Sequence, residues 1–420
     1  MDIPGNEIPT PSWGKYFQRH LQFAQSLVNT YKGDEPFHLY IQKYFASHKK
    51  HGSKDRKQIA SLCYSYFRVG CGVSRNVAIH DKFLLGSFLC NSGHSLLLAQ
   101  LKPEWNAVIN LELNDKLKLV EDFFDIKNIF PFQKFLSKEI DHEKLTISFL
   151  QQPKIFLRVR PGKKFILREK IRSANFSFEE INDNCLVFSH NEKITDVINI
   201  DKEAVIQDYN SQRTGEFFLK YFSRQQLEHE AEKISSQTAV WDCCAGSGGK
   251  SILAFDIIKN CKLTVTDKRP SILQNLKKRF AAAGIRNYEA FVLDIESGAQ
   301  LPTGAGFQII IADVPCSGSG TWARAPEQHN FFKEEEIEKY ASLQKNIIRN
   351  ILPRLNECGI LLYITCSLFK KENEENVDYI LENFQLNLLH KEYLKGYEIH
   401  ADTLFVAVFK KPQQAIEQLS

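Results

Sequence analysis

The chain has 420 residues, of which 43% are hydrophobic and 25% charged, and its formal net charge is +4. This length predicts two or three domains, and the composition is that of a water-soluble globular protein rather than a disordered, fibrous or membrane-spanning one. The ten cysteines form no Cys-x-x-Cys pair and no Cys/His spacing typical of zinc ligands. We therefore expect free thiols in a reducing compartment and no bound metal.

The N-terminal segment, MDIPGNEIPTP, has neither the basic nor the apolar region of a signal peptide. No stretch of the sequence approaches the roughly 20 apolar residues that a transmembrane helix needs. We therefore expect a cytoplasmic, monomeric protein with no membrane partner.

Residues 1–150 have the apolar spacing of a helical domain. Ser12 can cap a first helix with one apolar face, and Ser53 can cap a second helix that ends at Gly70. Further apolar runs of helical length follow between positions 103 and 150. The sequence therefore predicts an N-terminal helical domain.

A small α+β module, predicted to bind RNA, follows over residues 151–205. Its predicted elements are a half-buried strand with Ile155, Leu157 and Val159 on one face, a helix over 164–174, and strands at 185–189 and 204–207. A module of this size is too short to hold a large core alone.

Positive charge is concentrated in these N-terminal parts of the chain. The first 200 residues hold 28 Lys and Arg against 21 Asp and Glu, whereas the rest of the chain holds 26 against 29. Nine basic residues lie within 41–82 and eight within 154–172. Clustered positive charge is typical of polyanion binding, although a solvated basic face explains either cluster alone. Two such clusters favour RNA, with Arg158 and Arg160 as phosphate contacts.

From position 206 strands and helices alternate, and we predict an α/β fold with a mostly parallel, doubly wound sheet for residues 206–420. Strands are predicted at 239–241, 262–266, 288–293, 307–312, 359–364 and 404–409, and helices at 251–259, 271–283, 334–356 and 371–384. The stretch 314–333 shows no periodic pattern and is predicted to be a long, structureless loop.

A glycine-rich turn follows the first of these strands and is a candidate ligand site. It contains Cys244, Ala245, Gly246, Ser247, Gly248, Gly249 and Lys250. A phosphate-binding P-loop would need glycine at Cys244, and a dinucleotide fingerprint would need glycine at Ser251. Asp242, Asp267 and Asp294 end three successive strands, where carboxylates can accept hydrogen bonds from ribose hydroxyls. The set favours a cationic ligand that contains adenosine, although any one Asp alone can cap a turn.

Two cysteines lie just past the ends of two further predicted strands. Cys316 follows Asp313 by three residues in the sequence DVPCSGSG, and Cys366 lies in the sequence TCS. Ligands of open α/β sheets bind at this edge, so two thiols and a carboxylate there suit covalent chemistry on an electron-poor ring. Packing as small hydrophobes would explain one such cysteine but explains the pair poorly.

These segments together resemble the Sun family of RNA cytosine-C5 methyltransferases. DVPCSGSGTW, which begins at Asp313, is similar to the family's D-A-P-C-S-G-x-G signature, and residues 365–375 are similar to its second cysteine motif. The glycine-rich turn resembles the family's C-A-A-P-G-G-K, with Gly246 in place of Ala and Ser247 in place of Pro. The similarity covers about residues 200–412, and the helical part weakly resembles the family's NusB-like domain.

The resemblance implies an RNA cytosine-C5 methyltransferase that uses S-adenosylmethionine, with ribosomal RNA as its partner and an antiparallel strand closing its sheet. It implies that residues 244–250 bind the methionine moiety, Asp267 the ribose and Asp294 the adenine edge. By the same resemblance, Asp313 lies between cofactor and target base.

The resemblance also assigns roles to the two thiols. It makes Cys366 the nucleophile that adds to C6 of cytosine, and Cys316 the thiol that assists product release. Two other functions stay open. An amino-group methyltransferase would want an aromatic residue where this chain has Cys316, and a non-catalytic RNA-binding assembly factor would need neither thiol. The sequence does not identify the RNA or the cytidine.

Overall fold

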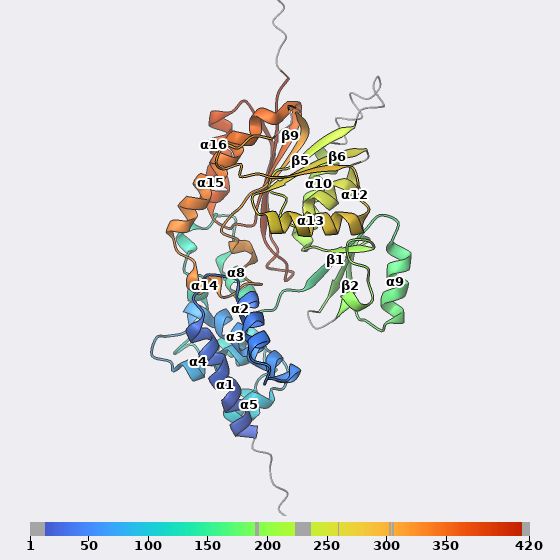
Figure 1. Ribbon diagram of the computed structural model, residues 1–420. Helices are drawn as coiled ribbons and strands as arrows, with labels where there is room; N and C mark the ends of the chain where they lie inside the picture. Colours follow the sequence, from blue (N-terminus) through green and yellow to red (C-terminus); the bar gives the residue numbers. More distant parts are fainter. Residues whose placement is uncertain are drawn as a thin grey trace, which may run out of the picture. The chain divides into compact units, whose positions relative to one another are not determined.

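The computed structural model describes residues 13–189, 193–222, 237–258, 260–301, 304 and 306–413. The chain folds into two compact units (Figure 1). The helical unit comprises residues 1–133, 142–152 and 322–332, and the sheet unit comprises residues 134–141, 153–321 and 333–420. The finer division at residues 150 and 205 stays a prediction.

The helical unit contains α1 to α8 and α14. Their bounds are α1 Trp13–Thr30, α2 Phe37–Ser47, α3 Ser53–Val69, α4 Ile79–Leu89, α5 Leu96–Leu101, α6 Pro103–Ala107, α7 Leu113–Lys118, α8 His142–Phe149 and α14 Gln328–Phe331. The predicted second helix does end at Gly70, but Gly52 rather than Ser53 is its N-cap. No side chain caps the helix at Gly52, and the Asp55 carboxylate accepts a hydrogen bond from the Gly52 N–H. Ser12 lies outside the described residues.

The segment predicted to be a long, structureless loop is ordered by burial. Its residues 322–332 belong to the helical unit and include α14. Trp322 is buried, with its ring 5.6 Å from that of Phe130 and 5.7 Å from that of Phe132. The Glu327 carboxylate accepts a hydrogen bond from the Phe37 N–H at the start of α2. The sequence showed no periodicity because these contacts come from residues far away in the chain.

The sheet unit contains a four-stranded sheet of order β2-β3-β1-β4. Its elements are β1 Ile155–Val159, α9 Lys164–Ser173, β2 Glu179–Asn182, β3 Cys185–Phe188 and β4 Ala204–Ile206. The α+β character was predicted, but β1 is buried on both faces rather than on one. Leu157 packs with α9 in one core cluster, and Phe156 packs with Cys185 and Ala401 in another. Covering elements on both sides of a strand override its alternating pattern.

The larger sheet has the order β10-β11-β9-β8-β5-β6-β7. Its strands are β5 Thr238–Asp242, β6 Cys261–Asp267, β7 Tyr288–Val292, β8 Phe307–Asp313, β9 Leu355–Thr365, β10 Asn387–Leu394 and β11 Leu404–Lys410. The five strands β7, β6, β5, β8 and β9 are parallel to one another, and β11 is antiparallel to both of its neighbours, β9 and β10. This confirms the predicted α/β sheet and its antiparallel end.

Helices cover both faces of this sheet, as Figure 1 shows. The helices α10 (Tyr209–Phe217), α12 (Gly249–Ile257) and α13 (Pro270–Ala283) lie on one face, and α15 (Glu335–Ile351) and α16 (Glu374–Asn383) lie on the other. Ile309 and Ile311 of β8 share a core cluster with Leu253 of α12 and Leu276 of α13. Because β5, β6, β8 and β9 are parallel, their C-terminal ends meet at one edge.

Candidate active site

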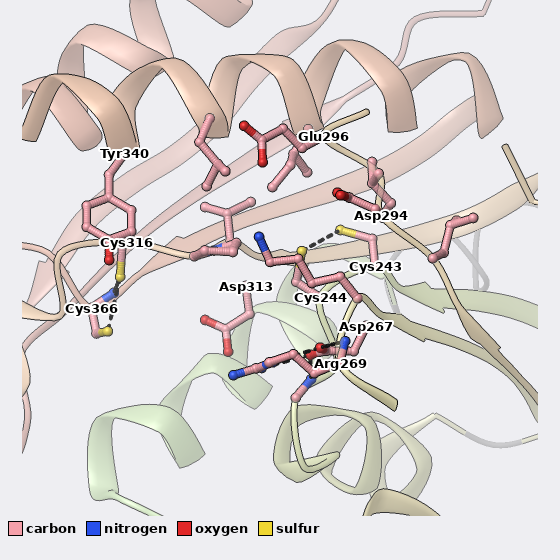
Figure 2. Close-up of a pocket in the computed structure, with 18 residues that line it drawn as sticks. Cys243, Cys244, Asp267, Arg269, Asp294, Glu296, Asp313, Cys316, Tyr340 and Cys366 are labelled. Carbon is pink, nitrogen blue, oxygen red and sulfur yellow. Dashed lines mark hydrogen bonds and ion pairs between the residues drawn. The ribbon is translucent and has the colours of Figure 1, made fainter. Parts of the chain in front are cut away.

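A cavity of about 430 Å³ opens at this edge of the sheet (Figure 2). Its lining includes seven of the residues that the sequence singled out, Cys244, Gly246, Asp267, Asp294, Asp313, Cys316 and Cys366. Ala245, Ser247, Gly248, Gly249 and Lys250 lie outside that lining and shape the turn next to it. The structure thus brings segments up to about 120 residues apart in the sequence to one cavity.

The glycine-rich turn joins β5 to α12 and depends on left-handed backbone. Gly246 has φ +53° and Gly248 has φ +85°, values that residues with a Cβ rarely adopt. A Cβ at Gly248 would also lie 2.8 Å from the ring of Phe280. The Gly246 N–H donates to the Asp267 carboxylate over 3.1 Å, which ties the turn to the end of β6.

Asp267 is held as a carboxylate at the end of β6. Its Oδ1 accepts from the backbone N–H and the Nε of Arg269, both at 2.9 Å, and its Oδ2 accepts from Arg269 Nη2 at 2.9 Å. Burial would raise the pKa of Asp267, but the hydrogen bonds from Arg269 and Gly246 lower it. The side chain is therefore a hydrogen-bond acceptor at neutral pH.

Asp313 lies between the two ends of the cavity. Figure 2 shows its carboxylate between the thiols of Cys316 and Cys366 on one side and the Asp267–Arg269 pair on the other. Its Oδ2 lies 2.6 Å from Nζ of Lys250. Lys250 is in the first turn of α12, and its side chain is largely buried. Burial lowers the pKa of Lys250, but the negative charge of Asp313 and of a Cys366 thiolate more than offsets this, so the pKa is raised.

The two thiols of the predicted motifs are in direct contact. The Sγ atoms of Cys316 and Cys366 are 3.1 Å apart, and the Cys366 N–H donates to Cys316 Sγ over 3.3 Å. The pKa of Cys316 is well above its ordinary value because of the hydrogen bond with Cys366, burial and the nearby negative charge of Glu372. Cys316 therefore keeps its proton at neutral pH.

Several residues of the cavity were not predicted from the sequence. Tyr340, Leu343 and Ile347 of α15 line it, and burial raises the pKa of Tyr340. Arg269 lines it as well. The three residues on α15 follow helical spacing, but nothing in one sequence tells which face of that helix meets a ligand. The position of Arg269, two residues after a predicted ligand-binding Asp, was an available signal.

The prediction that Arg158 and Arg160 contact phosphate is wrong. Both guanidiniums bind Asp256 of α12, with N–O distances of 2.6 Å in each case, and only 7% and 10% of the two side chains is exposed. Burial lowers the pKa of Arg158, although the charge of Asp256 opposes this. The two arginines are buried ion-pair partners, which a count of charges along the sequence could not reveal.

Most other basic residues of this cluster are also neutralised. The pairs are Lys154 with Glu179, Lys164 with Asp183, Arg168 with Glu180 and Lys170 with Glu203. The acidic partners lie outside residues 154–172, so these ion pairs offset the positive charge that is concentrated in that stretch of the sequence.

Within the described residues no group of three or more His, Cys, Asp and Glu side chains could hold a metal ion. A search of the same part of the chain finds no helix that is both long and apolar enough to cross a membrane.

Comparison with known proteins agrees with this geometry. Residues 231–409 match the family model described as 16S rRNA methyltransferase RsmB/F. This stretch is therefore similar to the methyltransferase domain that the RsmB/F model describes. The matched residues contain the glycine-rich turn, the candidate carboxylates of Asp267, Asp294 and Asp313, and both cysteine motifs. The match confirms the predicted resemblance to the Sun family for this part of the chain.

Curated relatives match a similar part of the chain. A probable ribosomal RNA small subunit methyltransferase B of Bacillus subtilis is 28% identical over 171 residues, which are 40% of this chain and 38% of the relative. A 28S rRNA (cytosine-C(5))-methyltransferase of Mus musculus is 29% identical over 160 residues, or 36% of this chain and 19% of the relative. The chain thus matches less than half the length of either relative.

Solved structures extend the likeness of fold beyond this region. The crystal structure of PH0851 covers 98% of this chain and all of its own, with a TM-score of 0.67 and 16% identity. The crystal structure of NSun6 from Pyrococcus horikoshii with SFG covers 69% of this chain and 97% of its own, with a TM-score of 0.54 and 13% identity. At these identities the two structures show a shared fold only.

Proposed function

We propose that the chain transfers a methyl group to C5 of cytosine in RNA, with ribosomal RNA as the substrate class and S-adenosylmethionine as methyl donor. The observation that carries the proposal is the contact of two thiols at one end of a cavity whose other end presents carboxylates. The family match and the names of the curated relatives support the same reaction.

The cavity suits S-adenosylmethionine in size and in chemistry. Its volume of about 430 Å³ is within the ~300–1,000 Å³ typical of small-molecule sites. The Asp267 carboxylate already accepts four hydrogen bonds, and ribose hydroxyls can replace the two that come from the exposed side chain of Arg269. Asp294 also lines the cavity. Gly246 leaves open space at the turn, because a Cβ there would meet no atom within 4 Å. When bound there, S-adenosylmethionine supplies an electrophilic methyl group.

Cys366 is the proposed nucleophile. C5 of cytosine is a weak nucleophile, and addition of a thiolate at C6 turns the C5–C6 double bond into an enamine whose C5 carries electron density. A new S–C6 bond forms in this step, and the displaced electron pair is taken up at N3 with a proton. Asp313 can accept a hydrogen bond from the N3/N4 edge and so stabilise the protonated ring.

Cys316 is the proposed partner in product release. After C5 carries the methyl group, its proton must leave to water. The electron pair of the C5–H bond then re-forms the C5–C6 double bond, while the S–C6 bond breaks and its electron pair returns to Cys366 Sγ. The raised pKa of Cys316 favours the neutral thiol, which can donate its hydrogen bond to Cys366 Sγ as that sulfur regains negative charge. The target cytidine must be unstacked to reach this site.

Release of tritium tests the reaction. RNA carrying [5-³H]cytidine should lose tritium to water when incubated with the chain and S-adenosylmethionine, because substitution at C5 expels that hydrogen. No release from a ribosomal RNA transcript, with the cofactor bound, would overturn the proposal and favour the non-catalytic assembly factor. Methyl transfer without tritium release would favour an amino-group methyltransferase.

A further inference from the structure

A buried carboxylate outside the cavity joins the two cysteine turns. Glu372 lies within the second cysteine motif and is fully buried. Its Oε2 accepts from the backbone N–H of Ser317, directly after Cys316, over 2.9 Å. Its Oε1 accepts from the hydroxyl of Ser367, directly after Cys366, over 2.6 Å. One side chain therefore bonds to the residue that follows each thiol.

Further hydrogen bonds fix the position of this carboxylate. Gln344 of α15 donates its Nε2–H to Oε2 over 2.9 Å, and the Tyr363 hydroxyl donates to the Glu372 carbonyl over 2.5 Å. Gln344 also donates to the Pro315 carbonyl over 3.0 Å. Burial raises the pKa of Glu372, although the hydrogen bonds from Ser317, Ser367 and Gln344 oppose this and favour the charged form. The three donors also hold the carboxylate in one geometry.

We propose that Glu372 is a positioning residue that sets the relative placement of the two thiols, so that Cys366 is the thiol that attacks. This inference rests on the proposed function for its consequence in catalysis. Its basis is the pair of hydrogen bonds that the Glu372 carboxylate accepts at the two cysteine turns.

A negative charge on Glu372 acts on the Cys316 thiol. It raises the pKa of Cys316, after the larger effects of the hydrogen bond with Cys366 and of burial. Tyr340 of α15 and Tyr363 of β9 also interact with the Cys316 thiol, and burial raises the pKa of both, which keeps them neutral. The acidic group among these neighbours of Cys316 is Glu372.

The test measures the reactivity of each thiol without RNA or cofactor. Wild type and Glu372→Gln are treated with iodoacetamide between pH 6 and 10, and alkylation of each cysteine is followed by peptide mass spectrometry. We expect wild type to be labelled first at Cys366. In Glu372→Gln the pKa of Cys316 should fall, so that Cys316 is labelled at lower pH than in wild type.

Glu375→Gln is the matched control. Its carboxylate is exposed on the same segment and lies 3.9 Å from Nζ of Lys370, so this variant should be labelled like wild type. In the tritium-release assay Glu372→Gln should lose kcat by on the order of 100-fold with little change in KM for S-adenosylmethionine, because the thiols and not the cofactor site are displaced.

An identical labelling profile in folded Glu372→Gln and wild type would overturn the inference, and so would unchanged kcat. Should Glu372→Gln fail to fold, Ser367→Ala removes one of the bonds to the carboxylate, together with those that the Ser367 hydroxyl accepts from Ser317 and Phe369, and must shift labelling in the same direction. Unchanged labelling in that variant would overturn the inference as well. Wild type that is labelled as expected but releases no tritium would instead contradict the proposed function alone.

Discussion

Single side chains at the strand ends differ in chemistry because their partners differ. Asp267 receives hydrogen bonds from Arg269 and Gly246, and its pKa is lowered despite burial. Asp242 is as deeply buried but receives one bond from Ser251, and its Oδ1 has no partner among the described residues. Burial raises the pKa of Asp242 to about 7. Two aspartates in the same layer of one sheet are therefore suited to different tasks.

Asp267→Ala should weaken binding of S-adenosylmethionine by about 1.5–3 kcal/mol, because it removes charge-assisted acceptors for the ribose. Isothermal titration calorimetry on wild type and variant measures this difference. The same dissociation constant in both proteins would place the ribose elsewhere.

Asp242 should make the free energy of unfolding depend on pH. Its pKa is higher in the folded than in the unfolded chain, so the folded state binds the proton more tightly and stability from this group is lost as pH rises from about 4 to 7. Asp242→Asn should remove that loss, about 1.4 kcal/mol for each pH unit between the two pKa values. Urea unfolding at pH 5 and pH 8 compares the two proteins, and parallel pH dependences would contradict the assignment.

At the scale of elements, buried ion pairs connect the small sheet to helices that cover the large sheet within the sheet unit. Arg158 of β1 and Arg160 just after it both bind Asp256 on α12, and Arg160 also donates to the carbonyl of Ala283 at the end of α13. Such contacts hold β1 in a defined place against two helices of the larger sheet. Their geometry favours a structural role for this part of the basic cluster.

Asp256→Ala should lower the free energy of unfolding by about 3–5 kcal/mol, because it leaves two buried guanidiniums without their anion. Asp183→Ala is the control, since 83% of that side chain is exposed and its ion pair with Lys164 is on the surface. The control should leave the free energy of unfolding nearly unchanged, because solvent screens an exposed ion pair. Equal stability of both variants in chemical denaturation would show that the buried pairs contribute little.

At the scale of the whole molecule, local patterns predicted much of the sheet unit and less of the rest. The apolar runs at 307–312 and 359–364 predicted β8 and β9, because central parallel strands are buried on both faces and read as continuous apolar segments. The exposed edge strand β10 was missed, since its residues alternate in burial and carry little apolar signal. Residues of the candidate site could be predicted at positions where the end of a predicted strand coincides with a sequence motif.

Contacts between distant segments account for what the sequence did not predict. The aromatic packing of Trp322, the pairing of Arg158 with Asp256 and the bridge made by Glu372 each join residues more than 50 positions apart or in different motifs. One sequence carries the residue types of such contacts but not their partners. Charge and burial in particular depend on neighbours that only the folded chain supplies.

The proposed division of covalent catalysis between the two thiols can be tested directly by trapping the protein–RNA adduct. Cys316→Ala should accumulate a complex with cytidine-containing RNA that survives denaturing electrophoresis, because Cys366 still forms the S–C6 bond while its elimination is impaired. Cys366→Ala and the double variant should form none. An adduct in Cys366→Ala but not in Cys316→Ala would contradict this assignment of roles and make Cys316 the nucleophile.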